Sequence, residues 1–254
     1  MIGKKYILTG GTGGLGQSLL SELIGRGATV LVLGRNERKL KVLQELYPQQ
    51  LEVYLIALDD LPAVRGLAAS LINKGETYDG IINNAGYGYF KSFADHSADE
   101  IVAMMNVNVT HPAVLLKELI PLVRPGASVV NIVSQSARVA TPFGSVYAAS
   151  KAALLSLSNA LRLEYPDLHV MTVSTGPVET DFFSRADVSG HYSEKTKSIQ
   201  LDCDSLAAQI VQAIADKKNE VNRPRWMHHS LTLYQIAPRA IEKLFRPLFL
   251  SKHD

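Results

Sequence analysis

A phenol and an ammonium group stand four residues apart in the stretch VYAASKAAL, residues 146–154. Four residues are about one helical turn, so a helix would place Tyr147 and Lys151 on the same face. An isolated tyrosine has a pKa of about 10 and is a poor acid or base at neutral pH. A nearby ammonium favours the phenolate and lowers that pKa. The pair therefore predicts a proton-transfer site, although the spacing alone would also fit a helix edge with a solvated lysine.

A second group of residues could bind phosphate. The glycine-rich stretch TGGTGGLG, residues 9–16, lies between an apolar run and a helical pattern. Gly10 would allow a tight turn, Gly14 would let the backbone approach a pyrophosphate, and Gly16 would let the helix pack closely on the strand. The N–H groups at the start of the helix favour an anion. Because no G-K-[ST] follows, a P-loop is excluded, and the pattern predicts dinucleotide binding.

The residue after the second apolar strand indicates which dinucleotide is bound. That strand ends VLVLGRN, with Gly34 and Arg35 where NAD-binding sequences usually place a carboxylate for the ribose 2′-hydroxyl. A guanidinium binds a 2′-phosphate instead, so Arg35 predicts NADP(H), with capping of the sheet end as the alternative role. Lys39 could assist Arg35, but it is interpreted as solvated. In the next strand, either Asp59 or Asp60 could accept a hydrogen bond from the adenine amino group, and Asp59 is favoured.

These groups must be positioned by alternating strands and helices. Near-continuous apolar strands between helical patterns are typical of a parallel sheet covered on both faces. Right-handed crossovers then give a doubly wound α/β sheet, a Rossmann fold in three α/β/α layers. The predicted strands are 5–10, 29–34, 51–58, 78–86, 127–134 and 168–175, and the predicted helices are 14–26, 36–47, 62–74, 98–123, 146–165 and 204–217.

Two segments depart from this alternation. Residues 182–203 are polar and without a clear period, and their place after a strand predicts a lid over the site, with an ordinary surface loop as the alternative. Residues 222–254 form a variable C-terminal segment that contains three prolines. Its apolar residues Ile241, Leu244, Phe245 and Leu248 have helical spacing among basic residues. Contact with a membrane or an acyl substrate is one interpretation, and packing against the domain or a second subunit is favoured.

Composition limits the class of protein. The chain has 254 residues, 46% of them hydrophobic, and a formal net charge of +2. This predicts a single domain over 1–254 and gives no electrostatic footprint for nucleic acid. The single cysteine, Cys203, excludes an internal disulfide framework and fits a reducing compartment. No metal site, secretory signal or membrane span is expected, so the predicted location is cytoplasmic.

Together the motifs resemble those of the classical short-chain dehydrogenases/reductases over roughly residues 5–180. The resemblance implies catalytic roles for Ser134, which lies thirteen positions before Tyr147, and for Tyr147 and Lys151. It also implies that Asn108, with Asn106 as the competing choice, holds a water in a proton relay. The motifs that carry the resemblance are TGGTGGLG (9–16), NNAG (83–86), MNVNVTHP (105–112), VVNIVSQS (129–136), YAASK (147–151) and TGPVETDF (175–182).

The resemblance assigns further roles around the cofactor. Asn83 would brace the central sheet, and Ser136 is interpreted as a supporting or solvated hydroxyl. Thr175 stands where the family usually has proline, which leaves the path of the following loop open. The predicted cofactor contacts are Gly10, Thr12, Gly13, Gly14, Leu15, Gly16, Arg35, Asp59, Asn84, Ala85, Gly86, Tyr147, Lys151, Gly176, Pro177, Val178 and Thr180.

The chemistry implied is reversible hydride transfer between NADPH and a carbonyl or secondary alcohol on CH–OH groups. Tyr147 would donate the proton, Ser134 would bind the substrate oxygen, and Lys151 with the water at Asn108 would restore the proton. Aromatic and apolar residues in 87–93, 136–146 and 177–200 predict an apolar or aromatic small-molecule substrate. Family members are commonly homodimers or homotetramers. The alternative is a non-enzymatic NADP(H) sensor or scaffold, for which Tyr147 would be unnecessary.

Overall fold

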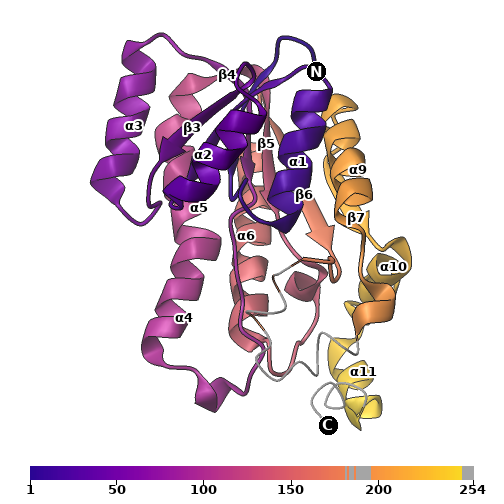
Figure 1. Cartoon of the computed structure of the whole chain (residues 1–254). Coiled ribbons are helices and arrows are strands. Elements are labelled where there is room, and N and C mark those ends of the chain that lie inside the picture. The colour runs from indigo at the N-terminus through magenta and orange to yellow at the C-terminus, as the bar shows by residue number, and fades with distance from the viewer. Residues whose placement is uncertain (181, 183–185, 187–195, 248–254) are drawn as a thin grey trace.

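The computed structural model describes residues 1–180, 182, 186 and 196–247 of the chain (Figure 1). Seven parallel strands form one sheet in the order β3-β2-β1-β4-β5-β6-β7. From β1 the chain adds β2 and β3 on one side of the sheet. It then crosses back to place β4 on the other side of β1 and adds β5, β6 and β7 beyond it. This is the predicted doubly wound fold, and it opens a crevice at the carboxyl ends of the central strands, where the direction reverses.

The strands form where β-branched and leucine-rich runs can be buried on both faces. All six predicted strands are present, although the fifth begins at Val123, whose pairing with Tyr78 brings the chain into the sheet before residue 127. The seventh was not predicted, because it has only four residues and only Val221 is buried. The strands are β1 Lys5–Thr9, β2 Thr29–Gly34, β3 Leu51–Leu55, β4 Tyr78–Asn83, β5 Val123–Ile132, β6 His169–Thr175 and β7 Glu220–Arg223.

Three helices cover one face of the sheet. One buried apolar cluster joins this layer to the strand residue Val32. It contains Leu19 and Leu23 of the layer's first helix and Ile210 and Ile214 of its last helix. The burial of such apolar stripes is the main force that holds amphipathic helices on a sheet. The helices of this layer are α1 Gly14–Gly25, α2 Glu37–Leu46 and α9 Cys203–Ala215.

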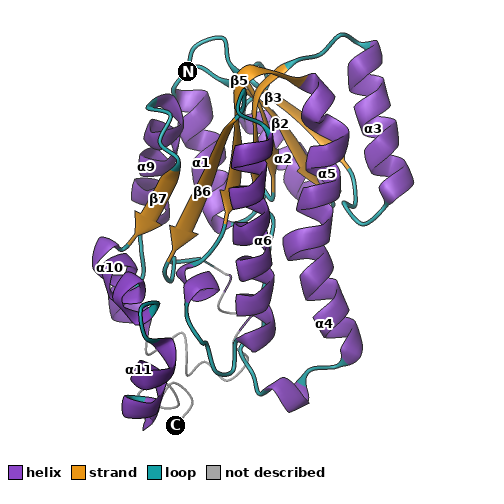
Figure 2. Ribbon diagram, turned by 180° about the vertical axis from the view of Figure 1, so that it is seen from behind, coloured by secondary structure: helices purple, strands orange, loops and turns teal. Residues whose placement is uncertain are grey.

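The opposite face has its own apolar cluster, and Figure 2 shows from behind the helices that cover this face. Leu67 and Leu115 pack there against Ile7, Leu31 and Val129 of the sheet. The helices of this layer are α3 Leu61–Asn73, α5 His111–Leu119 and α6 Ser145–Glu164. The two layers and the sheet between them give the predicted three-layer arrangement.

The long helix predicted over 98–123 is divided into pieces. A π-helical turn at Asn106–Thr110 separates α4, Ala98–Met105, from α5, and a 3-10 turn at Ile120–Leu122 precedes β5. Insertions of this kind are frequent at functional sites. The π-helical turn carries Asn108, which the sequence had singled out.

The C-terminal segment is more regular than the sequence suggested. Two short helices, α10 Arg225–Tyr234 and α11 Pro238–Leu244, follow β7 and lie beyond the carboxyl ends of the strands (Figure 2). Pro224 and Pro238 stand at their starts, where a missing N–H costs no helical hydrogen bond. The predicted lid over 182–203 lies mostly outside the described residues, with Lys197–Ile199 forming a 3-10 turn.

Candidate active site

A cavity of about 2210 Å³ opens at the carboxyl ends of the strands. Every catalytic and cofactor residue predicted from the sequence lines it except Asn108, which is fully buried behind the wall. Of the predicted aromatic lining, Tyr87, Tyr89, Phe90 and Phe182 face the cavity. Phe93 and Phe143 do not line it, and Phe93 is 65% exposed. Phe183 lies outside the described residues.

The glycine turn at the start of α1 depends on one left-handed residue and one close backbone approach. Gly10 has a φ of +68°, a conformation that favours glycine, and a side chain on Gly16 would overlap the Gly10 carbonyl oxygen. Asn84 fixes the turn from β4, because its Nδ2 donates to the carbonyl oxygens of Thr9 and Gly10, both at 3.2 Å. These contacts support the roles expected of Gly10 and Gly16.

The turn fits the pyrophosphate of a dinucleotide. Gly13 is the N-cap of α1 and offers no side-chain cap, and the first turn carries no acidic residue. The N–H groups at this helix end are therefore left for an anionic ligand, which the positive end of the helix dipole also favours. The residues present thus suit the coenzyme that the sequence predicts.

One part of the cavity carries charged side chains that follow β2 and β3. Arg35 and Lys39, which follow β2, are exposed and both line the cavity. Lys39 is therefore closer to the site than a simple solvated lysine. Of the two candidate aspartates, Asp59 lines the cavity, whereas Asp60 caps α3 by accepting a hydrogen bond from the Ala63 N–H at 2.9 Å. This division of roles supports the preference for Asp59.

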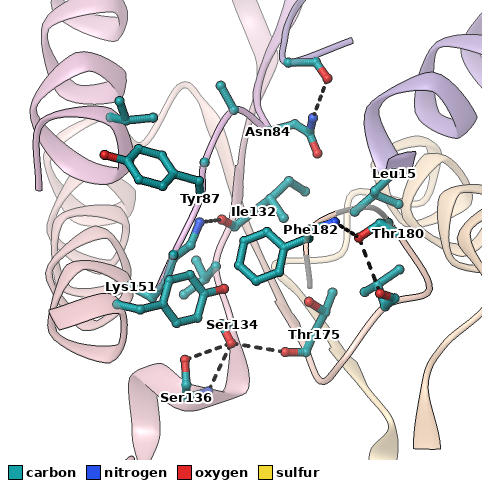
Figure 3. Close-up of a pocket in the computed structure, with 18 of the residues that line it drawn as sticks. Leu15, Asn84, Tyr87, Ile132, Ser134, Ser136, Lys151, Thr175, Thr180 and Phe182 are labelled. Carbon is teal, nitrogen blue, oxygen red and sulfur yellow. Dashed lines mark hydrogen bonds between the residues drawn. The ribbon is translucent and has the colours of Figure 1, made fainter. Parts of the chain in front are cut away.

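Ser134 lies at the end of β5 in a small hydrogen-bond network (Figure 3). Its Oγ accepts hydrogen bonds from the Ser136 N–H at 3.2 Å and from the Ser136 hydroxyl at 2.9 Å. The Ser134 hydroxyl donates to the carbonyl oxygen of Thr175 at 3.4 Å, which is long for a hydroxyl donor. Ser136 therefore supports Ser134 directly, and the weakly held Ser134 proton can turn toward another acceptor.

Tyr147 lies in the first turns of α6 among aromatic rings. The rings of Phe90 and Phe182 each have their centres 5.7 Å from that of Tyr147. A Cβ on Gly88 would lie 2.6 Å from the Tyr147 ring, so only glycine allows the backbone to approach so closely. The sequence did not indicate this role of Gly88, because only the fold brings residue 88 to α6.

Lys151 is held on the same face of α6, one turn after Tyr147. Its Nζ donates to the Ile132 carbonyl oxygen at 2.9 Å and lies 5.9 Å from the centre of the Tyr147 ring. The side chain is almost fully buried, and this burial lowers the pKa of Lys151 to about 8. Lys151 can therefore bind or release a proton close to neutral pH.

Asn108 anchors the π-helical turn to the cavity wall. Its Nδ2 donates to the Tyr87 carbonyl oxygen at 2.8 Å and to Ser150 Oγ at 2.9 Å, and its Oδ1 accepts from the Tyr87 N–H at 3.0 Å. A Cβ on Gly86 would lie 3.0 Å from Asn108 Oδ1 and 3.1 Å from Lys151 Nζ. Gly86 thus leaves a small polar space between the two side chains.

Asparagines brace the sheet beneath the site. Asn83 of β4 donates to the Asn131 side chain of β5 at 2.8 Å, and Asn131 donates to Ser158 Oγ of α6 at 2.8 Å. This series of hydrogen bonds confirms that Asn83 braces the central strands. It also ties α6, which carries Tyr147 and Lys151, to the sheet.

The C-terminal segment, for which the sequence left several contacts open, supplies a further wall of the cavity. Residues of α10 and α11, among them Trp226, Leu231 and Ile241, also line it. The apolar spacing around Ile241 indicated a helix, but it could not show which surface that helix would cover. Among the described residues, no group of three or more His, Cys, Asp or Glu side chains could hold a metal ion, and no helix is long and apolar enough to cross a membrane.

Comparison with known proteins agrees with this geometry. The family model described as short chain dehydrogenase matches residues 4–188. Dehydrogenase/reductase SDR family member 7B of Bos taurus is 30% identical over 85% of this chain and 71% of that protein. The 11-beta-hydroxysteroid dehydrogenase-like 4A protein of Arabidopsis thaliana is 26% identical over 94% of this chain and 82% of that protein.

Solved structures share the fold at lower identity. A short-chain dehydrogenase from Streptomyces avermitilis superposes with a TM-score of 0.82 at 24% identity, over 96% of both chains. An alcohol dehydrogenase from Thermococcus sibiricus, complexed with 5-hydroxy-NADP, has a TM-score of 0.75 at 22% identity, over 86% of this chain and 94% of that one. A short chain dehydrogenase/reductase from Burkholderia phymatum in complex with NAD has a TM-score of 0.82 at 19% identity, over 96% of this chain and 95% of that one.

Proposed function

This chain belongs to the short chain dehydrogenase family, and on that premise we propose that it transfers hydride between NADP(H) and a carbonyl or secondary alcohol on an apolar or aromatic small molecule. The observation that carries the proposal is the convergence of Ser134, Tyr147 and Lys151 on one cavity, together with the uncapped start of α1. A nicotinamide coenzyme, when bound, supplies or accepts the hydride.

Tyr147 and Ser134 act on the substrate oxygen in this proposal. During reduction the Tyr147 hydroxyl donates its proton to that oxygen, and the Ser134 hydroxyl gives a second hydrogen bond. The aromatic rings of Phe90 and Phe182 exclude water from one side of the phenol. In oxidation the same groups work in reverse, with the phenolate as the base.

Lys151 and Asn108 serve the proton balance. Because burial lowers the pKa of Lys151 to about 8, its Nζ can hold a proton near Tyr147 and release it at moderate pH. The polar space beside Gly86, between Asn108 Oδ1 and Lys151 Nζ, is suited to a water molecule that passes the proton onward. Asn108 thus supports the relay from a buried position rather than from the cavity lining.

The test of the proposed chemistry is substitution of Tyr147. Tyr147→Phe should bind NADPH as the wild type does and lose turnover of a carbonyl panel by a factor of about 10²–10⁴, the usual contribution of a positioned acid. The loss of NADPH absorbance measures the turnover rate, and coenzyme fluorescence measures NADPH binding. Turnover unchanged by Tyr147→Phe would refute the mechanism. No NADPH consumption by the wild type over the panel would favour the sensor alternative.

The preference for NADP(H) rests on Arg35 and on the absence of a carboxylate at the end of β2. Arg35→Asp should lower kcat/KM for NADPH about tenfold or more and favour NADH, because a bidentate phosphate contact becomes a repulsion. Arg38→Asp is the matched control, since Arg38 is exposed on the same loop–helix segment and does not line the cavity. If NADPH preference survived in Arg35→Asp, the coenzyme assignment would be wrong.

Two further expectations belong to this proposal. Residues 1–254 form one domain, which predicts a single cooperative unfolding transition in denaturant. The family resemblance favours a homodimer or homotetramer, and sedimentation equilibrium distinguishes either assembly from a monomer. Two separate transitions would contradict the first expectation, and a monomer at micromolar concentration would contradict the second.

A further inference from the structure

The cavity extends beyond the catalytic groups to a wall built by the C-terminal helices. We call this surface the C-terminal wall. Its residues recur at helical spacing on one face of α10 and continue onto α11, which places them side by side on a single surface. The apolar and aromatic members are Trp226, Met227, Leu231, Tyr234, Ile241 and Phe245.

The C-terminal wall is attached to the loops that carry the catalytic groups. Gln135, which follows Ser134, donates from Nε2 to the carbonyl oxygens of Arg223 and Pro224 at 2.7 and 3.1 Å. The Gly176 N–H donates to the Arg223 carbonyl oxygen at 2.7 Å. These hydrogen bonds fix the start of α10 beside Ser134, so a group bound at Ser134 lies next to the C-terminal wall.

Two hydroxyl groups on this face of α10, those of Ser230 and Tyr234, form hydrogen bonds within the protein. Ser230 Oγ donates to the Trp226 carbonyl oxygen at 3.0 Å. The Tyr234 hydroxyl donates to Glu242 and accepts from the Ala140 N–H at 3.3 Å. Charged residues among the described cavity lining lie on other elements: Arg35, Lys39, Asp59, Asp99, Lys151 and Glu179. The wall thus presents mainly carbon to the cavity.

Part of this apolar surface is still open to solvent. Trp226 is 57% exposed and Phe245 is 48% exposed, although both line the cavity. Covering apolar area stabilises a complex by about 25 cal/mol per Å². An apolar ligand in the cavity would cover these two rings, whereas a small polar ligand would leave them in water.

We propose that the C-terminal wall binds the apolar part of the substrate, so that the enzyme acts on a carbonyl or alcohol carried by a long alkyl chain or a fused-ring skeleton. This inference rests on the proposed function, and it adds the class of substrate. The reacting oxygen lies at Ser134 and Tyr147, and the apolar group extends along α10 toward α11. Short, water-soluble carbonyls would occupy only the catalytic end.

Trp226 offers a direct measurement, because it is the only tryptophan of the chain. Methyl ketones from butanone to dodecanone are titrated into the full-length protein, with and without NADP⁺, while tryptophan emission is recorded. The emission should shift to shorter wavelength with the longer ketones, and Kd should fall about fourfold per added methylene until the wall is covered, the equivalent of about 0.8 kcal/mol each. Kd values within twofold of one another across the series would overturn the proposal.

Neighbouring residues give a matched pair of variants. Phe245 lines the cavity, whereas Leu244 is 74% exposed and does not. Phe245→Ala should weaken dodecanone binding about tenfold or more and leave butanone binding unchanged, and Leu244→Ala should change neither. Equal effects of the two substitutions would overturn the assignment of the wall. Because both residues lie at the end of a peripheral helix, the fold tolerates either change, which circular dichroism checks.

Comparison of decanone with decalone, which has the same number of carbons, distinguishes the two skeletons. Tighter binding of decanone indicates an alkyl chain, and tighter binding of decalone indicates fused rings. Failure of this inference is distinct from failure of the proposed function. If Tyr147→Phe abolishes turnover but Kd does not depend on chain length, the hydride chemistry holds and the apolar wall is wrong. If chain length governs binding but no ketone is turned over, the wall holds and the chemistry is wrong.

Discussion

The burial of Lys151 predicts that this residue lowers the free energy of unfolding of the protein while it serves catalysis. Lys151 is 5% exposed, and the single protein hydrogen bond of its Nζ among those described goes to the Ile132 carbonyl oxygen. Burial lowers the pKa of Lys151 from 10.5 to about 8. At 1.36 kcal/mol per pKa unit, holding the charged form in the fold costs roughly 3 kcal/mol below pH 8. Replacement by methionine, which has a similar length and no charge, removes this cost.

The net effect is smaller, because the hydrogen bond to Ile132 is also lost. Such a bond contributes about 1 kcal/mol. Lys151→Met should therefore raise the free energy of unfolding by about 2 kcal/mol at pH 7 while abolishing turnover. Guanidinium unfolding of both proteins without coenzyme measures the first effect, and the carbonyl assay measures the second.

The pH dependence gives a sharper test. Between pH 8 and 10.5 the unfolded wild type carries a proton on Lys151 that the folded wild type has released, so wild-type stability rises with pH in this window. The free energy of unfolding of Lys151→Met relative to the wild type should therefore fall by about 2.5 kcal/mol between pH 7 and pH 10, so that the advantage of about 2 kcal/mol at pH 7 is lost by pH 10. Burial raises the pKa values of Tyr6 and Tyr78, but both proteins contain these tyrosines, so their titration cancels in the difference.

Two results would refute this reasoning. A variant less stable than the wild type at pH 7 would show that the ammonium is favourably paired rather than desolvated. A difference in stability that stays constant from pH 7 to pH 10 would show that the lysine titrates at its ordinary pKa in the fold.

Three further substitutions test the positions of the catalytic groups. Gly88→Ala should displace the Tyr147 ring and lower kcat at least tenfold with little change in coenzyme Kd, which stopped-flow and binding assays separate. Ser136→Ala removes a donor to Ser134 and should lower kcat by a factor of about 3–10 with KM unchanged, while Ser136→Thr restores the rate. Asn131→Ala leaves buried amide groups unpaired and should lower the free energy of unfolding by about 2–3 kcal/mol in urea, and an unchanged midpoint would contradict that bracing role.

Local sequence patterns were sufficient to predict the fold and the chemistry-bearing residues. Periodicity located six of seven strands, because buried parallel strands need apolar runs that even a short window reveals. The glycine turn and the pair Tyr147 and Lys151 depend on spacing within one element, and the cavity indeed brings them together. β7 and α10 escaped prediction. β7 has only four residues. The apolar residues of α10 are helically spaced, but they stand among basic and polar residues in a run of only ten.

Contacts between distant segments were decided only by the tertiary structure. Residue spacing cannot show that Gly88 meets Tyr147, that Ser136 supports Ser134, or that α11 reaches the cavity, because these contacts depend on how separate elements pack. The environment of Lys151 has the same origin. The sequence determined that a lysine follows Tyr147 by one helical turn. Its burial, and with it the lowered pKa, arises because the fold packs α6 against β5 and the segment at Gly86.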